Sequence, residues 1–195
     1  SAHAVDREYR VLNALKNTDV PVAEVYLLCE DDTILGSSFY LMEYMQGRIF
    51  WDPALPELSN EERSQVYAEM NRVLAAIHNV DINAVRLGDY GRPGNYYERQ
   101  INRWSKQYQA STTEKIPEMD ALIEWLPQNM PEDDGISTLI HGDYRLDNLM
   151  FAPDSLKVIA VFDWELSTLG HPLADLAYQM MQRSMGRDWH IQGLA

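Results

Sequence analysis

The stretch His141-Gly142-Asp143-Tyr144-Arg145-Leu146-Asp147-Asn148 lies between two short apolar runs, and the interpretation of the whole chain starts from it. The flanking runs, residues 138–140 and 149–151, have the character of β-strands, so the stretch is expected to be a loop. Within it a carboxylate, Asp143, and an amide, Asn148, are five positions apart. A short loop between strands can turn both side chains into one pocket, where the carboxylate faces a hydroxyl and the amide oxygen binds a cation.

A second acidic residue stands at the end of another apolar run. Residues 157–162 form a candidate strand that ends in Asp163, fifteen positions after Asn148. A carboxylate at a strand end, next to a loop, can reach a metal ion that bridges phosphate oxygens. Asp143 and Asn148 also have the separation of the aspartate and asparagine in the kinase catalytic loop. The residues alone therefore favour phosphoryl transfer that depends on a divalent metal.

Composition excludes several other classes of protein. Neither Gly-x-x-x-x-Gly-Lys-Ser/Thr nor Gly-x-Gly-x-x-Gly occurs, so a P-loop and a Rossmann site have no support. The formal net charge of −14 argues against nucleic acid as a partner, because nucleic-acid-binding proteins present basic surfaces. No apolar run approaches the roughly 18 residues of a membrane span, and the single cysteine, Cys29, cannot form an internal disulfide. We therefore expect no membrane association and a reducing, cytoplasmic setting.

The pattern of apolar residues predicts an α+β fold. The order of elements is helix, hairpin, irregular connection, helices, short strands and helix, and a Ser-x-x-Glu capping box at Ser59 and Glu62 begins the second helix. A turn is expected at residues 30–33 and an irregular connection at residues 46–58. Helices are expected at residues 4–16, 59–78, 96–110, 118–128 and 172–185, and strands at residues 25–29, 38–44, 138–140, 149–151 and 157–162.

Two longer strings make the interpretation specific. One is Asp163-Trp164-Glu165-Leu166-Ser167-Thr168-Leu169-Gly170-His171-Pro172-Leu173-Ala174-Asp175, and the other is Gly47-Arg48-Ile49-Phe50-Trp51-Asp52-Pro53. With the loop at residues 141–148, they resemble the aminoglycoside phosphotransferase and choline-kinase-like superfamily. The resemblance covers essentially the whole chain. It is greatest to the branch whose members stand alone in bacteria or are fused to acyl-CoA dehydrogenases in animals.

The resemblance implies a protein-kinase-like bilobal fold and transfer of the γ-phosphate of ATP to a hydroxyl of a small molecule. By motif position, Asp143 would be the catalytic carboxylate that orients the acceptor hydroxyl or accepts its proton. Arg145 would stabilise charge on the transferring phosphoryl group. Asn148 and Asp163 would hold Mg²⁺.

The same resemblance assigns residues to the nucleotide. Glu8 matches the glutamate that pairs with a strand lysine at the α- and β-phosphates, and Glu43-Tyr44-Met45 matches the hinge whose backbone meets adenine. Only seven residues precede Glu8, and none is lysine. We therefore expect residues 1–45 to be the remainder of a small lobe whose start is missing. Residues 46–195 would be the helical lobe with the catalytic loop, and by the same resemblance we expect its end to be missing as well.

Several of these residues also have structural explanations. Arg145 could pair with Asp147, which is otherwise expected to face solvent, and Glu8 could be a helix-surface charge paired with Arg7 or Lys16. His141 is expected to bond nearby backbone. Asp175 is expected to cap its helix or to buttress the catalytic loop.

Three functions remain open from the sequence. The first is the ATP- and Mg²⁺-dependent phosphotransferase, with a hydroxylated acyl-CoA or a related metabolite as the acceptor that the branch resemblance suggests. The second is a pseudokinase that binds nucleotide or a partner without turnover, in keeping with the absence of the lysine. The third is a metal-dependent hydrolase that uses His141, Asp143, Asp163 and His171 as ligands. The oligomeric state is not predicted.

Overall fold

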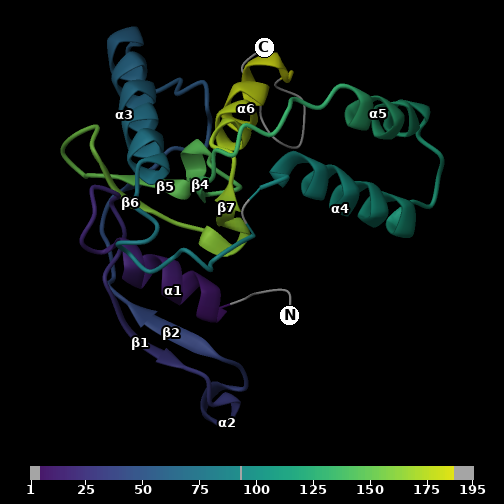
Figure 1. Cartoon of the computed structure of the whole chain (residues 1–195). Helices are drawn as coiled ribbons and strands as arrows, with labels where there is room; N and C mark the ends of the chain where they lie inside the picture. Colours follow the sequence, from purple (N-terminus) through teal and green to yellow (C-terminus); the bar gives the residue numbers. More distant parts are fainter. Residues whose placement is uncertain (1–4, 93, 187–195) are drawn as a thin grey trace.

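The computed structural model of the chain describes residues 5–92 and 94–186 (Figure 1). The α-helices are α1 (Val5–Leu15), α2 (Asp32–Leu35), α3 (Asn60–His78), α4 (Tyr96–Ser111), α5 (Pro117–Gln128) and α6 (Leu173–Met181). The strands are β1 (Val25–Cys29), β2 (Phe39–Met42), β3 (Arg48–Ile49), β4 (Thr138–Ile140), β5 (Leu149–Phe151), β6 (Val158–Val161) and β7 (Thr168–Gly170). Three short 3-10 helices are η1 (Leu146–Asn148), η2 (Trp164–Leu166) and η3 (Gln182–Ser184).

The described strands form three small antiparallel sheets. β1 pairs with β2, β5 lies between β3 and β6, and β4 pairs with β7. The chain therefore passes twice between the same two sheets, once from β4 to β5 through residues 141–148 and once from β6 to β7 through residues 162–167. The two connections touch, because the Phe162 N–H donates to the Asn148 carbonyl oxygen at 2.9 Å. This topology brings the two acidic motifs of the sequence side by side.

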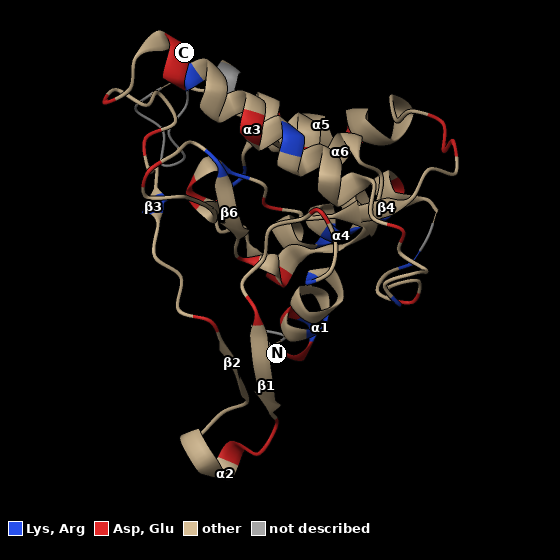
Figure 2. Ribbon diagram, turned by 90° about the vertical axis from the view of Figure 1, so that its left-hand side faces the viewer, with Lys and Arg blue, Asp and Glu red and all other residues tan. Residues whose placement is uncertain are grey.

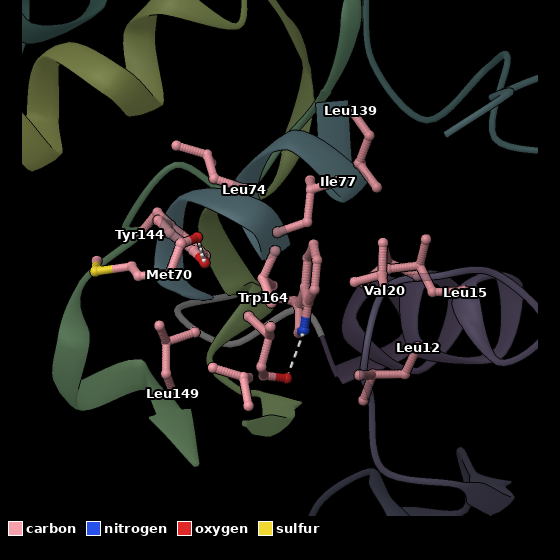
Figure 3. Packing of buried hydrophobic residues seen from close by; sticks show 14 of the residues in the cluster. Leu12, Leu15, Val20, Met70, Leu74, Ile77, Leu139, Tyr144, Leu149 and Trp164 are labelled. Carbon is pink, nitrogen blue, oxygen red and sulfur yellow. Dashed lines mark hydrogen bonds between the residues drawn. The ribbon is translucent and has the colours of Figure 1, made fainter. Parts of the chain in front are cut away.

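One hydrophobic cluster contains buried residues from both connections (Figure 3). Trp164 is fully buried in it, and its indole N–H donates to the Val161 carbonyl oxygen at 2.9 Å. Tyr144 is also fully buried, and its hydroxyl donates to the Met70 carbonyl oxygen of α3 at 2.7 Å. Three residues of α1 belong to the same cluster: Val11, Leu12 and Leu15. The helix near the N-terminus is therefore packed onto the body that carries the loop.

The elements lie in three groups in Figure 1. α1 and the β1–β2 hairpin lie on one side of the central strands, and α3 and α6 lie on the other (Figures 1 and 2). The α4–α5 hairpin extends away from the strands, and neither helix contains a fully buried residue. In Figure 2, Lys and Arg occur singly or in small groups among more numerous Asp and Glu, in keeping with the net charge of −14.

Most of the expected elements are present, and their ends differ by a few residues. The capping box is complete: the Ser59 hydroxyl accepts from the Glu62 N–H, and the Glu62 carboxylate accepts from the Ser59 N–H. The last helix is shorter than expected, since α6 ends at Met181 and continues as η3. The expected start of the first helix, at residue 4, lies outside the described residues.

Besides the 3-10 helices η1 and η2, the sequence interpretation missed three short elements. The expected turn at residues 30–33 contains the start of α2, a single helical turn that Asp31 caps through its bond from the Thr33 N–H at 2.9 Å. β3 lies in the connection that was expected to be irregular, and β7 follows η2. At Gly47, just before β3, an added Cβ would lie 2.5 Å from the Phe151 carbonyl oxygen, so glycine allows β3 to approach β5.

Candidate active site

Asp143 and Asn148 contact each other directly within the loop between β4 and β5. The Asn148 amide nitrogen donates to the Asp143 carbonyl oxygen at 2.9 Å and to its carboxylate Oδ2 at 3.3 Å. Both residues are partly buried. Because the amide nitrogen is engaged in this way, the amide oxygen Oδ1 is the atom that Asn148 can offer to a cation.

Asp163 follows the end of β6 by two residues and has a strained backbone conformation. Its φ of 63° and ψ of 59° lie in the left-handed region, which a residue other than glycine occupies at a cost. Burial raises the pKa of its carboxyl, and the charges of Glu165 and Asp143 raise it further. A divalent cation bound nearby would offset the repulsion between these neighbouring carboxylates. Asp163 and the Asn148 oxygen therefore fit the ligand set of a Mg²⁺ ion that takes its other ligands from water and phosphate.

A buried carboxylate on α6 holds the start of the loop at residues 141–148. Asp175 is 1% exposed, and its two oxygens accept from the His141 N–H and the Gly142 N–H, both at 2.8 Å. The ring Nε2 of His78, at the end of α3, lies 3.0 Å from the same carboxylate. The expectation that Asp175 buttresses the loop is confirmed by these contacts.

His141 has the structural role that the sequence suggested. Its side chain is fully buried, burial lowers its pKa, and its Nε2 lies 2.9 Å from the Phe162 carbonyl oxygen. A neutral imidazole donates there, and its Nδ1 accepts from the Asp143 N–H at 3.3 Å. The ring thus ties the two connections together through backbone atoms of Phe162 and Asp143.

Gly142 allows the two connections to approach closely. Its φ is +86°, and a Cβ built on it would lie 2.6 Å from the Leu166 carbonyl oxygen. Both features exclude a larger residue without movement of the backbone. Glycine at this position is therefore required by the geometry of the loop.

Arg145 lies beside Asp143 and is held by a neighbour on the same loop. Its Nε donates to Asp147 Oδ1 at 3.0 Å, and its Nη2 contacts Asp147 Oδ2. The expectation that Asp147 faces solvent is wrong, because its side chain is only 18% exposed and pairs with Arg145. The side chains of Arg145 and Asp147, two positions apart in the loop, therefore form an ion pair with each other.

Tyr178 on α6 neighbours both Asp143 and Arg145, and the sequence interpretation missed it. Burial raises the pKa of its hydroxyl, the neighbouring Asp143 carboxylate raises it further, and the neighbouring Arg145 guanidinium lowers it. The available signal was its position three residues after Asp175, which places both side chains on the same side of a helix.

Glu8 on α1 faces the second connection. Its carboxylate Oε1 accepts from the Trp164 N–H at 3.3 Å, and the neighbouring Tyr40 side chain partly offsets the effect of burial on the pKa of Glu8. The alternative of a surface ion pair is contradicted for both of its candidate partners. Arg7 donates instead to the Tyr90 and Ser167 carbonyl oxygens at 3.1 and 3.3 Å, and Lys16 donates to Asn13. α1 therefore carries Glu8 into the neighbourhood of Asp163.

Glu8→Gln is expected to raise the melting temperature at pH 7 by about 1 to 3 °C. Burial raises the pKa of Glu8 above its ordinary value of 4.5, so its charge opposes folding at neutral pH. This cost is relieved as the pH falls and the carboxyl is protonated in the folded state. Glutamine is neutral throughout and keeps an oxygen for the Trp164 N–H, so the gain should shrink towards pH 4.5. Scanning calorimetry from pH 4.5 to 7.5 measures the difference.

The control for this prediction is Glu61→Gln at the exposed start of α3, which should change the melting temperature by less than about 1 °C. A gain for Glu8→Gln that is independent of pH would contradict the electrostatic explanation.

The expected hinge lies at the surface between β2 and β3. The Glu43 N–H donates to the Glu24 carbonyl oxygen at 2.8 Å, and the Tyr44 side chain is 85% exposed. Met45 is partly buried. The structure therefore places this segment at the surface, and its role at adenine remains a prediction.

The geometry argues against a metal-dependent hydrolase. The His171 ring is engaged away from the loop, with Nδ1 3.0 Å from the Tyr97 hydroxyl and Nε2 3.3 Å from Asp134. The His141 ring is buried against backbone. Among residues 5–92 and 94–186, no three His, Cys, Asp or Glu side chains are placed to share a metal ion. The four proposed ligands do not come together as such a site.

Comparison with known proteins identifies the family. Residues 1–192 match the model of the phosphotransferase enzyme family. The chain belongs to this family. Its similarity to the acyl-CoA dehydrogenase branch is also confirmed, since this phosphotransferase-family chain is 51% identical over 181 residues to mouse acyl-CoA dehydrogenase family member 10. The match covers 93% of this chain and 17% of the mouse protein, so the chain spans about a fifth of the length of such relatives.

Solved structures confirm the α+β, protein-kinase-like fold of this phosphotransferase-family chain. A Ralstonia eutropha JMP134 protein named after the aminoglycoside phosphotransferases is 56% identical, with a TM-score of 0.91, and the match covers 98% of this chain and 59% of that one. An aminoglycoside phosphotransferase in a ternary complex with ADP and hygromycin B superposes with a TM-score of 0.68 over 94% of this chain and 63% of that one. At 18% identity, this second similarity concerns the fold alone.

No described helix in this phosphotransferase-family chain combines the length and the apolar character needed to cross a bilayer.

Proposed function

We propose that this chain is the catalytic part of a small-molecule kinase that moves the γ-phosphoryl group of ATP to a hydroxyl, with Mg²⁺ as cofactor. One observation carries the proposal: two touching connections between the same pair of sheets place Asp143 and Asn148 beside Asp163. Membership of the phosphotransferase family and the ADP-bound relative of the same fold support it.

The residues have distinct roles in the proposed reaction. Asp143 orients the acceptor hydroxyl and accepts its proton as the hydroxyl oxygen forms a bond to the γ-phosphorus and the bond to the bridging oxygen of ADP breaks. Arg145 stabilises charge on the transferred group and must release part of its contact with Asp147 to do so. Asn148 Oδ1 and Asp163 would hold Mg²⁺, which when bound neutralises charge on the phosphates.

The remaining assignments concern the nucleotide and the division of the chain. We assign Glu8 to the phosphate side and the backbone of Glu43, Tyr44 and Met45 to adenine. Residues 1–45 belong in this proposal to the small lobe and residues 46–195 to the helical lobe. In this proposal the protein acts in the cytoplasm on a small molecule that carries the acceptor hydroxyl. It has neither nucleic acid nor membrane as a partner.

For the acceptor we propose a hydroxylated acyl-CoA or a related metabolite. The support comes from relatives whose names join this region to acyl-CoA dehydrogenases, such as mouse family member 10. The assignment is tested by measuring phosphoryl transfer to a panel of hydroxyacyl-CoA thioesters. The corresponding free hydroxy acids and aminoglycosides are measured beside them. Transfer to aminoglycosides alone would contradict it.

Asp163→Ala is expected to weaken the binding of Mg·ATP to the full-length protein by at least about 10-fold. Its carboxylate is the one charged ligand in the proposed metal site, so its loss should also remove the dependence of binding on Mg²⁺. Isothermal calorimetry with and without Mg²⁺ measures both effects.

Asp154→Ala, in the exposed turn between β5 and β6, removes the same charge elsewhere and should bind like the parent protein. Equal Mg·ATP affinity in Asp163→Ala and the parent would contradict the metal assignment. Nucleotide binding without transfer to any acceptor would instead favour the pseudokinase.

A further inference from the structure

The connection that carries Asp163 is bound to α1 at two points. Near its start, Glu8 Oε1 accepts from the Trp164 N–H at 3.3 Å. At its other end, Arg7 Nη2 donates to the Ser167 carbonyl oxygen at 3.3 Å. Glu8 and Arg7 are consecutive residues of α1, and this helix packs against η2, which lies between the two bonds. One turn of α1 therefore contacts the connection on both sides of η2.

Tyr90, in the segment between α3 and α4, completes this contact. Its ring is buried, and the Arg7 guanidinium lies over it, with Cζ 4.2 Å from the ring centroid. Arg7 Nη2 also donates to the Tyr90 carbonyl oxygen at 3.1 Å. A guanidinium combines a planar set of donors with a flat face that stacks on aromatic rings. A single arginine can therefore bind two carbonyl oxygens and a ring at the same time.

The buried Ser167 hydroxyl joins Tyr90 to the backbone of the connection. Ser167 Oγ donates to the Trp164 carbonyl oxygen at 2.5 Å. This bond uses the single hydroxyl proton of the serine, so the Tyr90 hydroxyl is the donor in its 2.7 Å contact with Ser167 Oγ. The same Tyr90 hydroxyl lies 3.3 Å from the Arg7 carbonyl oxygen. The helix, the connection and Tyr90 thus form one hydrogen-bonded group.

We propose that Arg7 is a positioning residue for the Mg·ATP site, because it holds α1 against the connection at residues 162–167. This contact sets where Glu8 stands relative to Asp163. The inference rests on the proposed roles of Glu8 at the phosphates and of Asp163 at Mg²⁺. Arg7 acts through these two residues, since its own guanidinium is bound to backbone oxygens and to a ring.

An anchor is needed here because the groups that the contact brings together repel each other. Glu8 accepts from the N–H of the residue directly after Asp163, so two negatively charged side chains approach across the contact. The bonds from Arg7 are charge-assisted and partly buried, and such bonds are stronger than bonds between neutral groups. They can therefore keep α1 in place despite the repulsion.

Arg7→Gln tests the proposal, and Arg10→Gln is its matched control. Arg10 lies on the same helix, and among the described residues its hydrogen bonds go to the Arg86 carbonyl oxygen and to Asp89, in the segment between α3 and α4. Both variants remove the same charge from α1. In the full-length protein, Arg7→Gln should weaken Mg·ATP binding about 10-fold and Arg10→Gln less than about 2-fold. Isothermal calorimetry measures both at a temperature where each variant is folded.

Two further variants separate positioning from a general loss of stability. Tyr90→Phe keeps the ring under the guanidinium and removes the hydroxyl bound to Ser167, so it should weaken Mg·ATP binding about 3-fold. In a Glu8→Gln background, Arg7→Gln should weaken binding less than about 2-fold further, because the carboxylate that it positions is gone. Equal losses in Arg7→Gln and Arg10→Gln, or an undiminished loss in the Glu8→Gln background, would overturn the proposal.

Hydrogen exchange tests the contact without nucleotide. In a proteolytic peptide that spans residues 163–170, the amides should exchange at least about 5-fold faster in Arg7→Gln, since the bond from the Trp164 N–H to Glu8 is released more often. Arg10→Gln should exchange like the parent protein. Unchanged exchange in Arg7→Gln would contradict the anchoring. If the parent protein binds no Mg·ATP, the proposed function fails and the positioning role fails with it, whereas the exchange rates still show whether Arg7 holds α1.

Discussion

Asp143→Ala is expected to reduce phosphoryl transfer by at least about 1,000-fold while changing the affinity for Mg·ATP by less than about 3-fold. Asp143 faces the acceptor in the proposed reaction, whereas the metal ligands are Asn148 and Asp163. Its removal therefore takes away the group that receives the proton and leaves the metal site in place. Single-turnover transfer from γ-³²P-labelled ATP measures the chemical step, and calorimetry measures nucleotide affinity.

Asp143→Asn separates proton acceptance from positioning. Its amide keeps the volume and one oxygen, so it can still receive the Asn148 amide, but it cannot take up a proton. A loss similar to that of the alanine variant is expected. Asp154→Ala is again the charge control. Turnover close to that of the parent protein in both Asp143 variants would contradict the assignment of the catalytic carboxylate.

The features that the sequence predicted are mostly local. The loop at residues 141–148, the capping box at Ser59 and most helices and strands depend on spacings of a few residues, and the structure contains them. The proximity of Asp143 and Asp163 also followed from the motifs. Its physical cause was not visible, because it depends on the pairing of β4 with β7 and of β5 with β6.

The features that the sequence did not predict depend on contacts between distant segments. Tyr178 stands among apolar residues of α6, and only the packing of α6 against the loop shows its two charged neighbours. β3 has only two residues, too few for a periodic pattern, and forms through its pairing with β5. Asp147 was expected to face solvent because charged side chains are usually exposed. In the structure the loop curves so that the Asp147 side chain pairs with Arg145.

Asp175→Ala is expected to destabilise the fold by about 3 to 5 kcal/mol and to lower the melting temperature by roughly 6 to 20 °C. The carboxylate is 1% exposed and satisfies two backbone N–H groups, at His141 and Gly142, together with the ring of His78. Alanine would leave these donors buried without an acceptor, and a buried unsatisfied donor costs more than a lost surface contact. Urea unfolding and scanning calorimetry measure the loss.

The control is Asp120→Ala, which removes a carboxylate from the first turn of α5. Asp120 is 43% exposed and lies 3.5 Å from Lys115, so its loss should cost less than about 1 kcal/mol. Asp175→Asn should fall between the two, because its amide can accept one backbone N–H but opposes the other with its own donors. If Asp175→Ala unfolded at the same temperature as the parent, the loop would be held by other contacts. The turnover of that variant would then show whether Asp143 still reaches its place.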